Sequence, residues 1–280
     1  MLSHDSHFLH LTAFSCLLSI CGLALAQSEN ASKPLWEIGA VGIGASQQAY
    51  PGSDEQVNRA IALPFLIYRG KYFRADRDAV GLRAINTPRY ELDLSFAGTL
   101  GAGSNKLKAR EGMPKLGTLG EFGPRILIHL NPEAKNGRWN LDIPVRGVFD
   151  VSDGLKFKGL KFEPTINYAR RLGSGWSYTV SGGAAWADTR LSETLYGVAN
   201  EYATSTRPAF QAQGGLMNLR ASTAVIKDIH TDWRLFAYVR ADSVAGARNE
   251  ASSLVKRKTG GTVGIGFSYT WMRSSQSASD

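Results

Sequence analysis

The amino-acid sequence predicts an all-β protein, an antiparallel transmembrane β-barrel of about twelve strands that follows a cleaved signal peptide. Three observations lead to this prediction. Segments of about ten residues alternate between apolar and polar side chains, and this period places every second side chain on one face of a strand. The connections between the segments are short and long in turn, and five of the six tryptophans lie near one end of the predicted strands.

The N-terminus has the pattern of an export signal. A largely apolar stretch ends at Ala24-Leu25-Ala26, whose small residues form a cleavage motif directly before Gln27. We therefore expect cleavage between Ala26 and Gln27, with residues 1–26 as the signal peptide and residues 27–280 as the barrel domain. The alternative is a membrane anchor, but the apolar stretch is short and contains glycine. Both cysteines fall within residues 1–26, so we expect neither a disulfide nor a thiolate metal site in the mature barrel.

Alternation is clearest in five segments of the chain. In one of them, Leu141 and Ile143 face one side of the predicted strand, whereas Asn140 and Asp142 face the other. A tilted strand of about ten residues is long enough to cross a bilayer. The five segments are 90–100, 139–150, 161–169, 176–188 and 259–271.

Seven weaker segments complete the predicted set of strands. They are 36–47, 59–68, 71–75, 79–85, 121–130, 214–227 and 233–242. The stretch 71–85 is the least regular, and merging or re-pairing its strands would give ten or eleven instead of twelve. Long connections cover 48–58, 101–120, 189–210 and 243–257. Because outer-membrane barrels have short periplasmic turns and longer outer loops, we expect these four connections to face the cell exterior.

Alternation by itself does not reveal which face meets lipid, because a soluble barrel has the same period with its apolar face inside. The aromatic residues favour the membrane. Trp36, Tyr90, Trp139, Trp176 and Trp233 each open a predicted strand beside a short turn, on its apolar face. Such a ring of aromatic side chains at one level is typical of a membrane interface. Twelve strands around an apolar interior would also leave a cavity too wide for side chains to fill. We therefore predict an outer-membrane location.

The composition limits the classes of partner. The formal net charge of +8 could indicate a nucleic-acid partner. The basic residues are dispersed along the chain, however, and export separates the protein from nucleic acid. We expect outer-membrane lipid and anionic lipopolysaccharide to be the contacts that balance this charge.

The sequence offers no pattern typical of an enzyme or a metal site. Only two histidines, His129 and His230, follow the predicted signal peptide. No nucleophile motif accompanies them, and two separated histidines without cysteine make a poor metal site. We expect no catalytic residues, no metal and no cofactor.

The polar face of the predicted strands carries charges of both signs. We single out Glu91, Asp93, Arg125, His129 and Arg146 as side chains that face the lumen. One interpretation is the charged lining of a channel. The other is a plug of salt-bridged side chains, since charges in a poorly hydrated interior must be paired. Mixed signs at neighbouring depths favour the plug.

A turn motif, Tyr50-Pro51-Gly52-Ser53-Asp54, opens a series of short segments that together resemble the family of MltA-interacting protein and outer-membrane protein V (MipA/OmpV). The Pro and Gly of the motif suit the central positions of a type II turn. The other segments are 64–70, 109–116, 123–124, 143–146, 195–198, 203, 207–208 and 214–215.

The resemblance implies an outer-membrane barrel. For the member that gives the family its name, it implies a scaffold that bridges a murein-degrading transglycosylase and a murein synthase. Other members resemble adhesion, osmotic-response or permeability proteins, and the family supplies no catalytic residues. Our first hypothesis is therefore a non-enzymatic interaction protein of the envelope, linked to murein (peptidoglycan) hydrolases and synthases. The alternative is a narrow pore for small solutes or for osmotic or antibiotic-related permeability.

Overall fold

The computed structural model describes residues 34–69, 73–75, 80–82, 85–98, 107–134 and 136–278. The expected signal peptide, with its cleavage site between Ala26 and Gln27, lies outside these ranges. The predicted strands 71–75 and 79–85 lie only partly within them.

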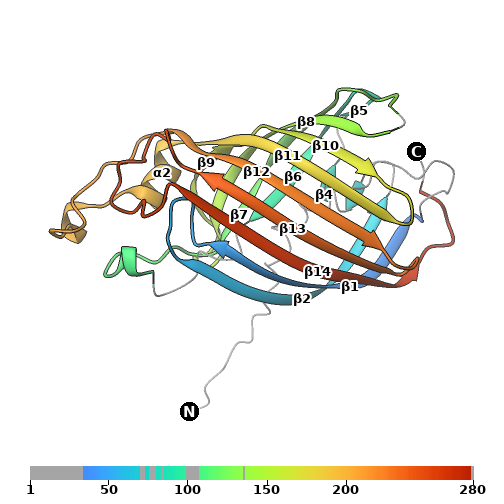
Figure 1. Ribbon diagram of the computed structural model, residues 1–280, viewed down its shortest axis with the longest axis horizontal. Helices are drawn as coiled ribbons and strands as arrows, with labels where there is room; N and C mark the ends of the chain where they lie inside the picture. Colours follow the sequence, from blue (N-terminus) through green and yellow to red (C-terminus); the bar gives the residue numbers. More distant parts are fainter. Residues whose placement is uncertain are drawn as a thin grey trace, which may run out of the picture.

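Fourteen strand segments within the described ranges form one antiparallel sheet (Figure 1). Helical structure in these ranges is limited to one α-helix and two short 3-10 helices, which lie in the connections. None of the helices in the described ranges combines the length and the apolar character that a membrane-spanning helix requires. The strands are β1 (Trp36–Gln48), β2 (Gln56–Arg69), β3 (Phe73–Ala75), β4 (Val80–Leu82), β5 (Ile85–Asn86), β6 (Tyr90–Gly98), β7 (Leu119–His129), β8 (Arg138–Asp150), β9 (Lys156–Phe162), β10 (Thr165–Arg171), β11 (Trp176–Ala187), β12 (Gly215–Asp228), β13 (Trp233–Ser243) and β14 (Thr259–Arg273), and the helices are η2 (Lys108–Arg110), α2 (Thr189–Tyr196) and η3 (Asn200–Tyr202).

The sheet closes on itself into a barrel. Its order is β4-β3-β2-β1-β14-β13-β12-β11-β10-β8-β7-β6-β5, and β4, at one edge, lies against β6, the strand next to the other edge. Both β9 and β10 pair with β8 and with β11, so they are two halves of one strand interrupted at Glu163 and Pro164. Proline lacks the N–H that the ladder needs, which explains the interruption. With β9–β10 and β4–β5 each counted as one strand, the described sheet has the twelve strands that the sequence predicts.

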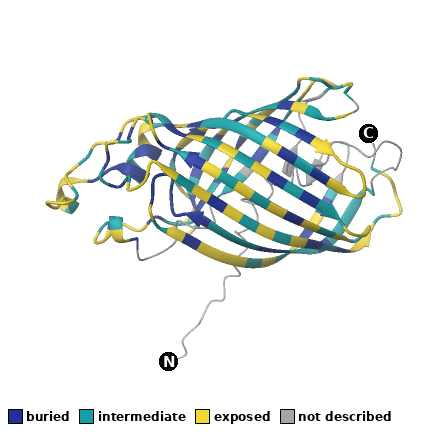
Figure 2. Cartoon of the chain, in the orientation of Figure 1, coloured by how far each residue is buried: buried dark blue, intermediate teal, exposed yellow. Residues whose placement is uncertain are grey.

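The two faces of the wall differ as the alternation predicts. Ile265 is 70% exposed and Val239 57% exposed on the outer face, whereas Arg146 is 7% exposed and Asp242 5% exposed on the inner face. Figure 2 shows exposed and buried positions alternating along the strands. A soluble barrel would have the opposite arrangement, so this wall is built to meet lipid.

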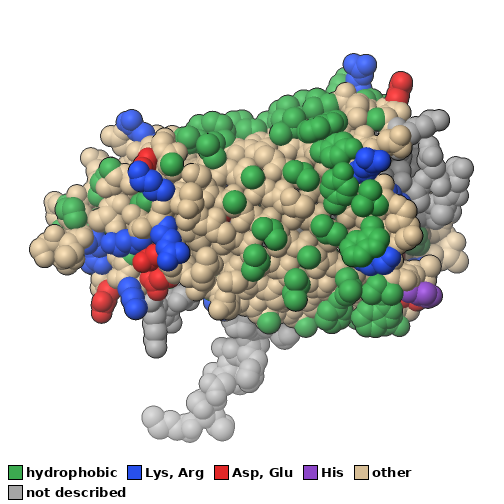
Figure 3. Space-filling view, viewed as in Figure 1, with side chains coloured by type: hydrophobic (Ala, Val, Ile, Leu, Met, Phe, Trp, Pro, Cys, Tyr) green, Lys and Arg blue, Asp and Glu red, His purple; other side chains and the backbone are tan. Residues whose placement is uncertain are grey.

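Aromatic side chains collect toward the end of the barrel that carries the short turns, called here the short-turn end. Trp139 lies 4.9 Å from Tyr168, and Trp233 lies 4.6 Å from Tyr269, between ring centroids. In Figure 3, apolar side chains gather most densely toward this end. Trp186, the remaining tryptophan, faces outward near the opposite end. The two ends of the apolar wall therefore both carry aromatic residues, as expected at two membrane interfaces.

Replacing Ile143 by arginine tests the assignment of the faces. Ile143 pairs with Ile126, which is 44% exposed on the outer wall, and it lies near the middle of β8. Arginine at a lipid-facing midplane position costs roughly 2–4 kcal/mol. We expect Ile143→Arg to lower the urea midpoint of the barrel in liposomes clearly more than Asp142→Arg, the same replacement at the neighbouring inner-face position. Equal losses for the two variants would contradict the assignment.

Candidate functional site

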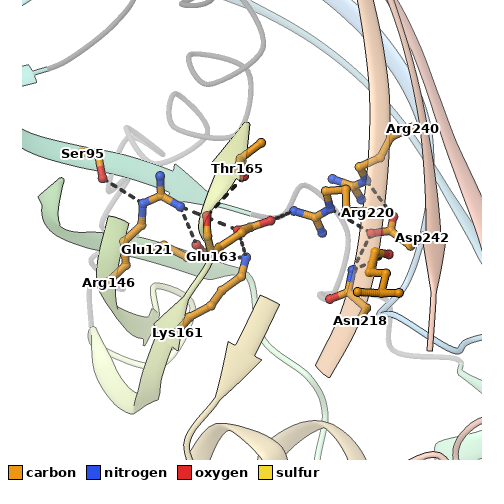
Figure 4. A network of polar contacts seen from close by, with 11 residues as sticks. Ser95, Glu121, Arg146, Lys161, Glu163, Thr165, Asn218, Arg220, Arg240 and Asp242 are labelled. Atoms are coloured by element: carbon orange, nitrogen blue, oxygen red, sulfur yellow. Dashed lines mark hydrogen bonds and ion pairs between the residues drawn. The ribbon is translucent and has the colours of Figure 1, made fainter. Parts of the chain in front are cut away.

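The inner face of the barrel holds a connected set of charged side chains, which we call the lumen network (Figure 4). Its members come from seven strands or their ends, so they connect parts of the wall that are far apart in sequence. They are Ser95 on β6, Glu121 on β7, Arg146 on β8, Lys161 and Glu163 at the end of β9, Asn218 and Arg220 on β12, Arg240 and Asp242 on β13, and Thr262 on β14.

Two carboxylates and two cations form the centre of the network. Lys161 Nζ lies 3.0 Å from Glu121 Oε1 and 2.7 Å from Glu163 Oε2. Arg146 Nη1 lies 3.6 Å from Glu121 Oε2 and 3.8 Å from Glu163 Oε2. Arg146 Nε also donates to Ser95 Oγ at 2.8 Å. These four charged side chains are at most 11% exposed, so each stabilises the others in a poorly hydrated space.

Arg220 extends the network across the wall to β13. Its guanidinium contacts Glu163 on one side and Asp242 on the other, the second through Nε to Oδ1 at 2.8 Å. Strand β11 lies between Arg220 and Glu163. There, Gly183 pairs with Arg220 on β12 and with Thr165 on β10. A side chain at Gly183 would meet the Pro164 carbonyl and Thr165, so the glycine allows β10 and β11 to lie close together below the contact of Arg220 with Glu163.

Asp242 gathers the donors at the far side of the network. Arg240 Nε donates to Asp242 Oδ2 at 2.7 Å, and Asn218 Nδ2 donates to Asp242 Oδ1 at 2.7 Å. Arg240 Nη2 in turn donates to Thr262 Oγ1 at 3.0 Å. The chain of contacts thus runs from β6 to β14.

The five lumen candidates of the sequence all lie on inner-face positions of the wall. Asp93 and Arg125 form a bidentate pair, with Nε to Oδ1 at 2.9 Å and Nη2 to Oδ2 at 2.5 Å. His129 lies between Glu91, 3.2 Å from its Nε2, and Asn140, 2.7 Å from its Nδ1. Arg146 belongs to the lumen network rather than to these pairs.

Sequence reasoning did not select Glu121 or Lys161, although both are central to the network. Glu121 stands four residues before Arg125 on the same strand, so strict alternation places the two on one face. That signal was available. The partnership of Lys161 with Glu121 depends on the register between β8 and its neighbours, which alternation does not reveal.

The interior also has an apolar part. Ile43, Ile226 and Phe236 pack together, with Val41 and Ile61 against them. These residues project inward from β1, β2, β12 and β13. The interior is therefore filled partly by paired charges and partly by apolar side chains.

Four long connections pack together at the opposite end of the barrel from the short turns. We call this assembly the cap; it comprises residues 49–55, 107–118, 188–214 and 244–258. Helix α2 lies within it (Figure 1), and Asp188 caps the helix by accepting from Leu191 N at 2.8 Å. The buried apolar side chains of the cap include Leu107, Leu116, Leu191, Leu195, Tyr196, Val198 and Leu254. The same apolar cluster includes residues of the wall, so the cap packs onto the ends of the strands; these residues are Val57, Leu119, Val148, Ala185, Ala187 and Met217.

The turn motif of the sequence lies at the centre of the cap. Tyr50 Oη donates to the Leu254 carbonyl at 2.8 Å, and the Pro51 carbonyl accepts from Tyr196 Oη at 3.0 Å. Gly52 has φ of 94°, a conformation that favours glycine. Ser53 N donates to the Tyr50 carbonyl at 3.0 Å and closes the turn, while Asp54 is exposed. The motif thus joins three of the long connections.

Two arginines join the connection 107–118 to the connection 188–214. Arg110 reaches from 107–118 to donate to the Leu195 carbonyl at 3.1 Å. Arg207 reaches back from 188–214, and its Nη1 donates to the Ala109 carbonyl at 3.2 Å and to the Glu111 carbonyl at 2.8 Å. Each arginine therefore binds the backbone of the other's connection, which fixes the two together.

Burial sets the protonation of the tyrosines in the cap. It raises the pKa of Tyr50 to about 12, and it raises the pKa of Tyr196 as well. Both hydroxyls therefore keep their protons at physiological pH and remain donors. Burial also lowers the pKa of Arg110, whose positive charge is poorly solvated in the cap.

Among the described residues, no cluster of metal ligands is found, and the two histidines differ in their partners: the exposed His230 contacts Thr231 Oγ1 and Asp232, whereas His129 has no hydroxyl partner. No three His, Cys, Asp or Glu side chains among them lie close enough to hold a metal ion. The ring nitrogens of His129 contact a carboxylate and an amide, and neither contact is a nucleophilic hydroxyl.

The family model described as MltA-interacting protein MipA matches residues 39–271, which is most of the chain. No curated protein matches the chain in sequence.

Solved structures similar to the chain include an outer membrane channel from Pseudomonas putida F1, with 9% identity, a TM-score of 0.46 and coverage of 88% of this chain and 99% of that one. They also include the NanC porin, with 7% identity, a TM-score of 0.39 and coverage of 82% and 98%. A third is the outer membrane phospholipase A of Escherichia coli, with 12% identity, a TM-score of 0.35 and coverage of 90% and 97%. On the family match, the chain belongs to the family of MltA-interacting protein MipA, and it is a β-barrel of the cell outer membrane.

Proposed function

We propose that this protein is a non-enzymatic scaffold of the cell envelope, a closed barrel that binds murein hydrolases or synthases at its short-turn end. The observation that carries the proposal is that paired charges line the inner face of the wall from β6 to β14, while the four long connections of the cap pack together at one end. Together, these two arrangements would obstruct the passage of a solute. The orientation that suits the barrel has the short turns in the periplasm and the cap at the cell surface.

Two further features support a binding role. The family description names an interaction with MltA, and the chain matches that family over residues 39–271. The charged side chains of the interior are also engaged with one another, as in the contacts of Arg146 and Lys161 with Glu121. Charged side chains that are paired with one another have a structural role in the barrel wall and are not poised for catalysis.

A narrow pore for small solutes is the second candidate. The observation that favours it is the number of ionisable side chains on the inner face, since channels use such side chains to select ions. In that case, the charges would be hydrated and only weakly coupled to one another, and the cap would have to move aside.

Conductance and capture together test the proposal. Purified wild-type protein in planar bilayers should show no steady current, because the lumen network and the cap close the passage. The same protein, used as bait in solubilised envelopes, should retain a murein hydrolase or synthase. A variant that disturbs both arrangements, with residues 199–210 of the cap removed and Arg146 replaced by alanine, should pass more current than the wild type. A large, steady current from the wild type, without capture of a murein enzyme, would move the function to solute permeation.

A further inference from the structure

The short-turn end carries charge unevenly. On the side formed by β12, β13 and β14, Arg234 Nε lies 2.5 Å from Asp228 Oδ1, and Arg273 Nη2 lies 2.7 Å from Asp232 Oδ1. Each arginine there has its own carboxylate. The other side is formed by β6, β7, β8 and β10. Its described residues include two glutamates, Glu91 and Glu133, and Glu91 contacts His129. They also include four arginines, which are Arg89, Arg138, Arg170 and Arg171. The second side therefore keeps an excess of positive charge.

Three of the arginines lie around the mouth of the barrel rather than toward lipid. Arg171 pairs with Ser177, which is 6% exposed on the inner face, and Arg138 pairs with Ala169, which is 3% exposed on the same face. The Arg89 carbonyl accepts from His129 N at 2.7 Å, which places the β5–β6 turn beside β7. Since neighbouring strands lie about 4.8 Å apart, these positions follow one another around the rim. We call Arg89, Arg138 and Arg171 the basic arc.

Arg170 differs from the arc in its direction. It pairs with Tyr178 on the outer face, at the level of the aromatic ring, where a long basic side chain meets phospholipid headgroups. Arg170 therefore belongs to the lipid-facing surface, and the three arginines of the basic arc do not.

Two members of the arc are available to a partner. The side chains of Arg89 and Arg171 are exposed, and no carboxylate among the described residues pairs with either of them. The contrast is with the lumen network, in which Arg146 and Arg220 each contact carboxylates. Guanidinium groups bind carboxylates through two parallel hydrogen bonds, and such pairs recognise carboxylates selectively.

We propose that the basic arc binds murein directly, through the carboxylates of its stem peptides. The murein layer faces the periplasmic end of an outer-membrane barrel, and its stem peptides present carboxylates at regular intervals. Several weak contacts made at once to such a polymer reinforce one another. The proposal rests on the orientation given under the proposed function, but it requires no partner enzyme. An acidic protein surface is the competing occupant.

Co-sedimentation with purified murein sacculi tests the proposal. The detergent-solubilised full chain should sediment with sacculi at low salt and be released as salt rises. Arg89→Gln combined with Arg171→Gln should weaken the apparent affinity about fivefold, the effect of losing two surface charge pairs. The matched control is Lys256→Gln combined with Arg257→Gln, which removes the same charge from two exposed residues of the cap and should leave binding unchanged. Heat-dependent gel mobility confirms that each variant is folded.

Sacculi whose carboxylates have been amidated provide the second measurement. They should bind the wild type as weakly as ordinary sacculi bind the arginine double variant. Equal binding to amidated and ordinary sacculi would overturn the proposal, as would an equal loss in the cap control. A third outcome is that the wild type does not sediment at all, while envelope pull-downs still yield a murein enzyme that the arginine double variant loses. In that case the arc binds an acidic protein, and the murein proposal fails. The proposed scaffold function would still stand.

Discussion

Replacing Arg146 by alanine is expected to destabilise the folded barrel by about 3–5 kcal/mol, the usual cost of breaking a buried ion pair by removing one partner. Arg146 is 7% exposed and contacts Glu121, Glu163 and Ser95. Its removal leaves Lys161 as the one cation in contact with Glu121 among the described ion pairs, while Glu163 keeps Lys161 and Arg220. The free energy of unfolding, measured by urea titration in liposomes, reports the change.

A second variant separates lost charge from lost packing. Arg146→Ala combined with Glu121→Gln removes one charge of each sign, so it should recover part of the stability that the single variant loses. Lys256→Ala is the exposed control and should change stability by no more than about 0.5 kcal/mol. If Arg146→Ala costs less than ~1 kcal/mol and instead changes ion selectivity in bilayers, the inner charges are hydrated and the lumen is a channel.

Alternation along the strands and the aromatic residues of the strand ends were together sufficient to predict the fold and the faces of the wall. Alternation placed Ile143 and Asp142 on opposite faces, and the aromatic residues indicated that the face of Ile143 meets lipid. These features depend on the sequence of each strand alone. The local period decides them, because a strand has only two faces.

The contacts of the interior depend on more than one strand at a time. Arg220 reaches Glu163 across β11, and this contact requires the registers of β10, β11 and β12 together. The division of one predicted strand at Pro164 is local and could have been predicted, since proline interrupts a ladder. The pairing across β11 could not.

The cap was predicted only as a set of motifs. Tyr50 contacts a carbonyl 204 positions away, and Tyr196 contacts one 145 positions away. A single sequence contains no signal that pairs such distant residues. The resemblance marked the motifs as a set, and the structure explains the set, because the motif residues join separate connections into one assembly.

Replacing Leu254 by alanine is expected to open the cap while leaving the barrel wall folded. Leu254 is 0% exposed in the apolar core of the cap, and a buried leucine replaced by alanine costs about 2–5 kcal/mol. The wall is held by its own ladder of hydrogen bonds, so the loss falls on the cap. A cysteine at Ser192, which is 1% exposed on α2, reports opening of the cap through its reaction with a maleimide.

The labelling rate measures how often the cap opens. A loss of about 2 kcal/mol should raise it ~30-fold, provided that opening is fast relative to reaction. Leu155→Ala is the matched control, because Leu155 is 63% exposed at the tip of a neighbouring turn and should leave the rate unchanged. Unaltered heat-dependent gel mobility would show that the wall is intact. If Leu254→Ala instead unfolds wall and cap together, the two form one cooperative unit. An unchanged labelling rate would mean that the packed core of the cap does not hold the four connections closed.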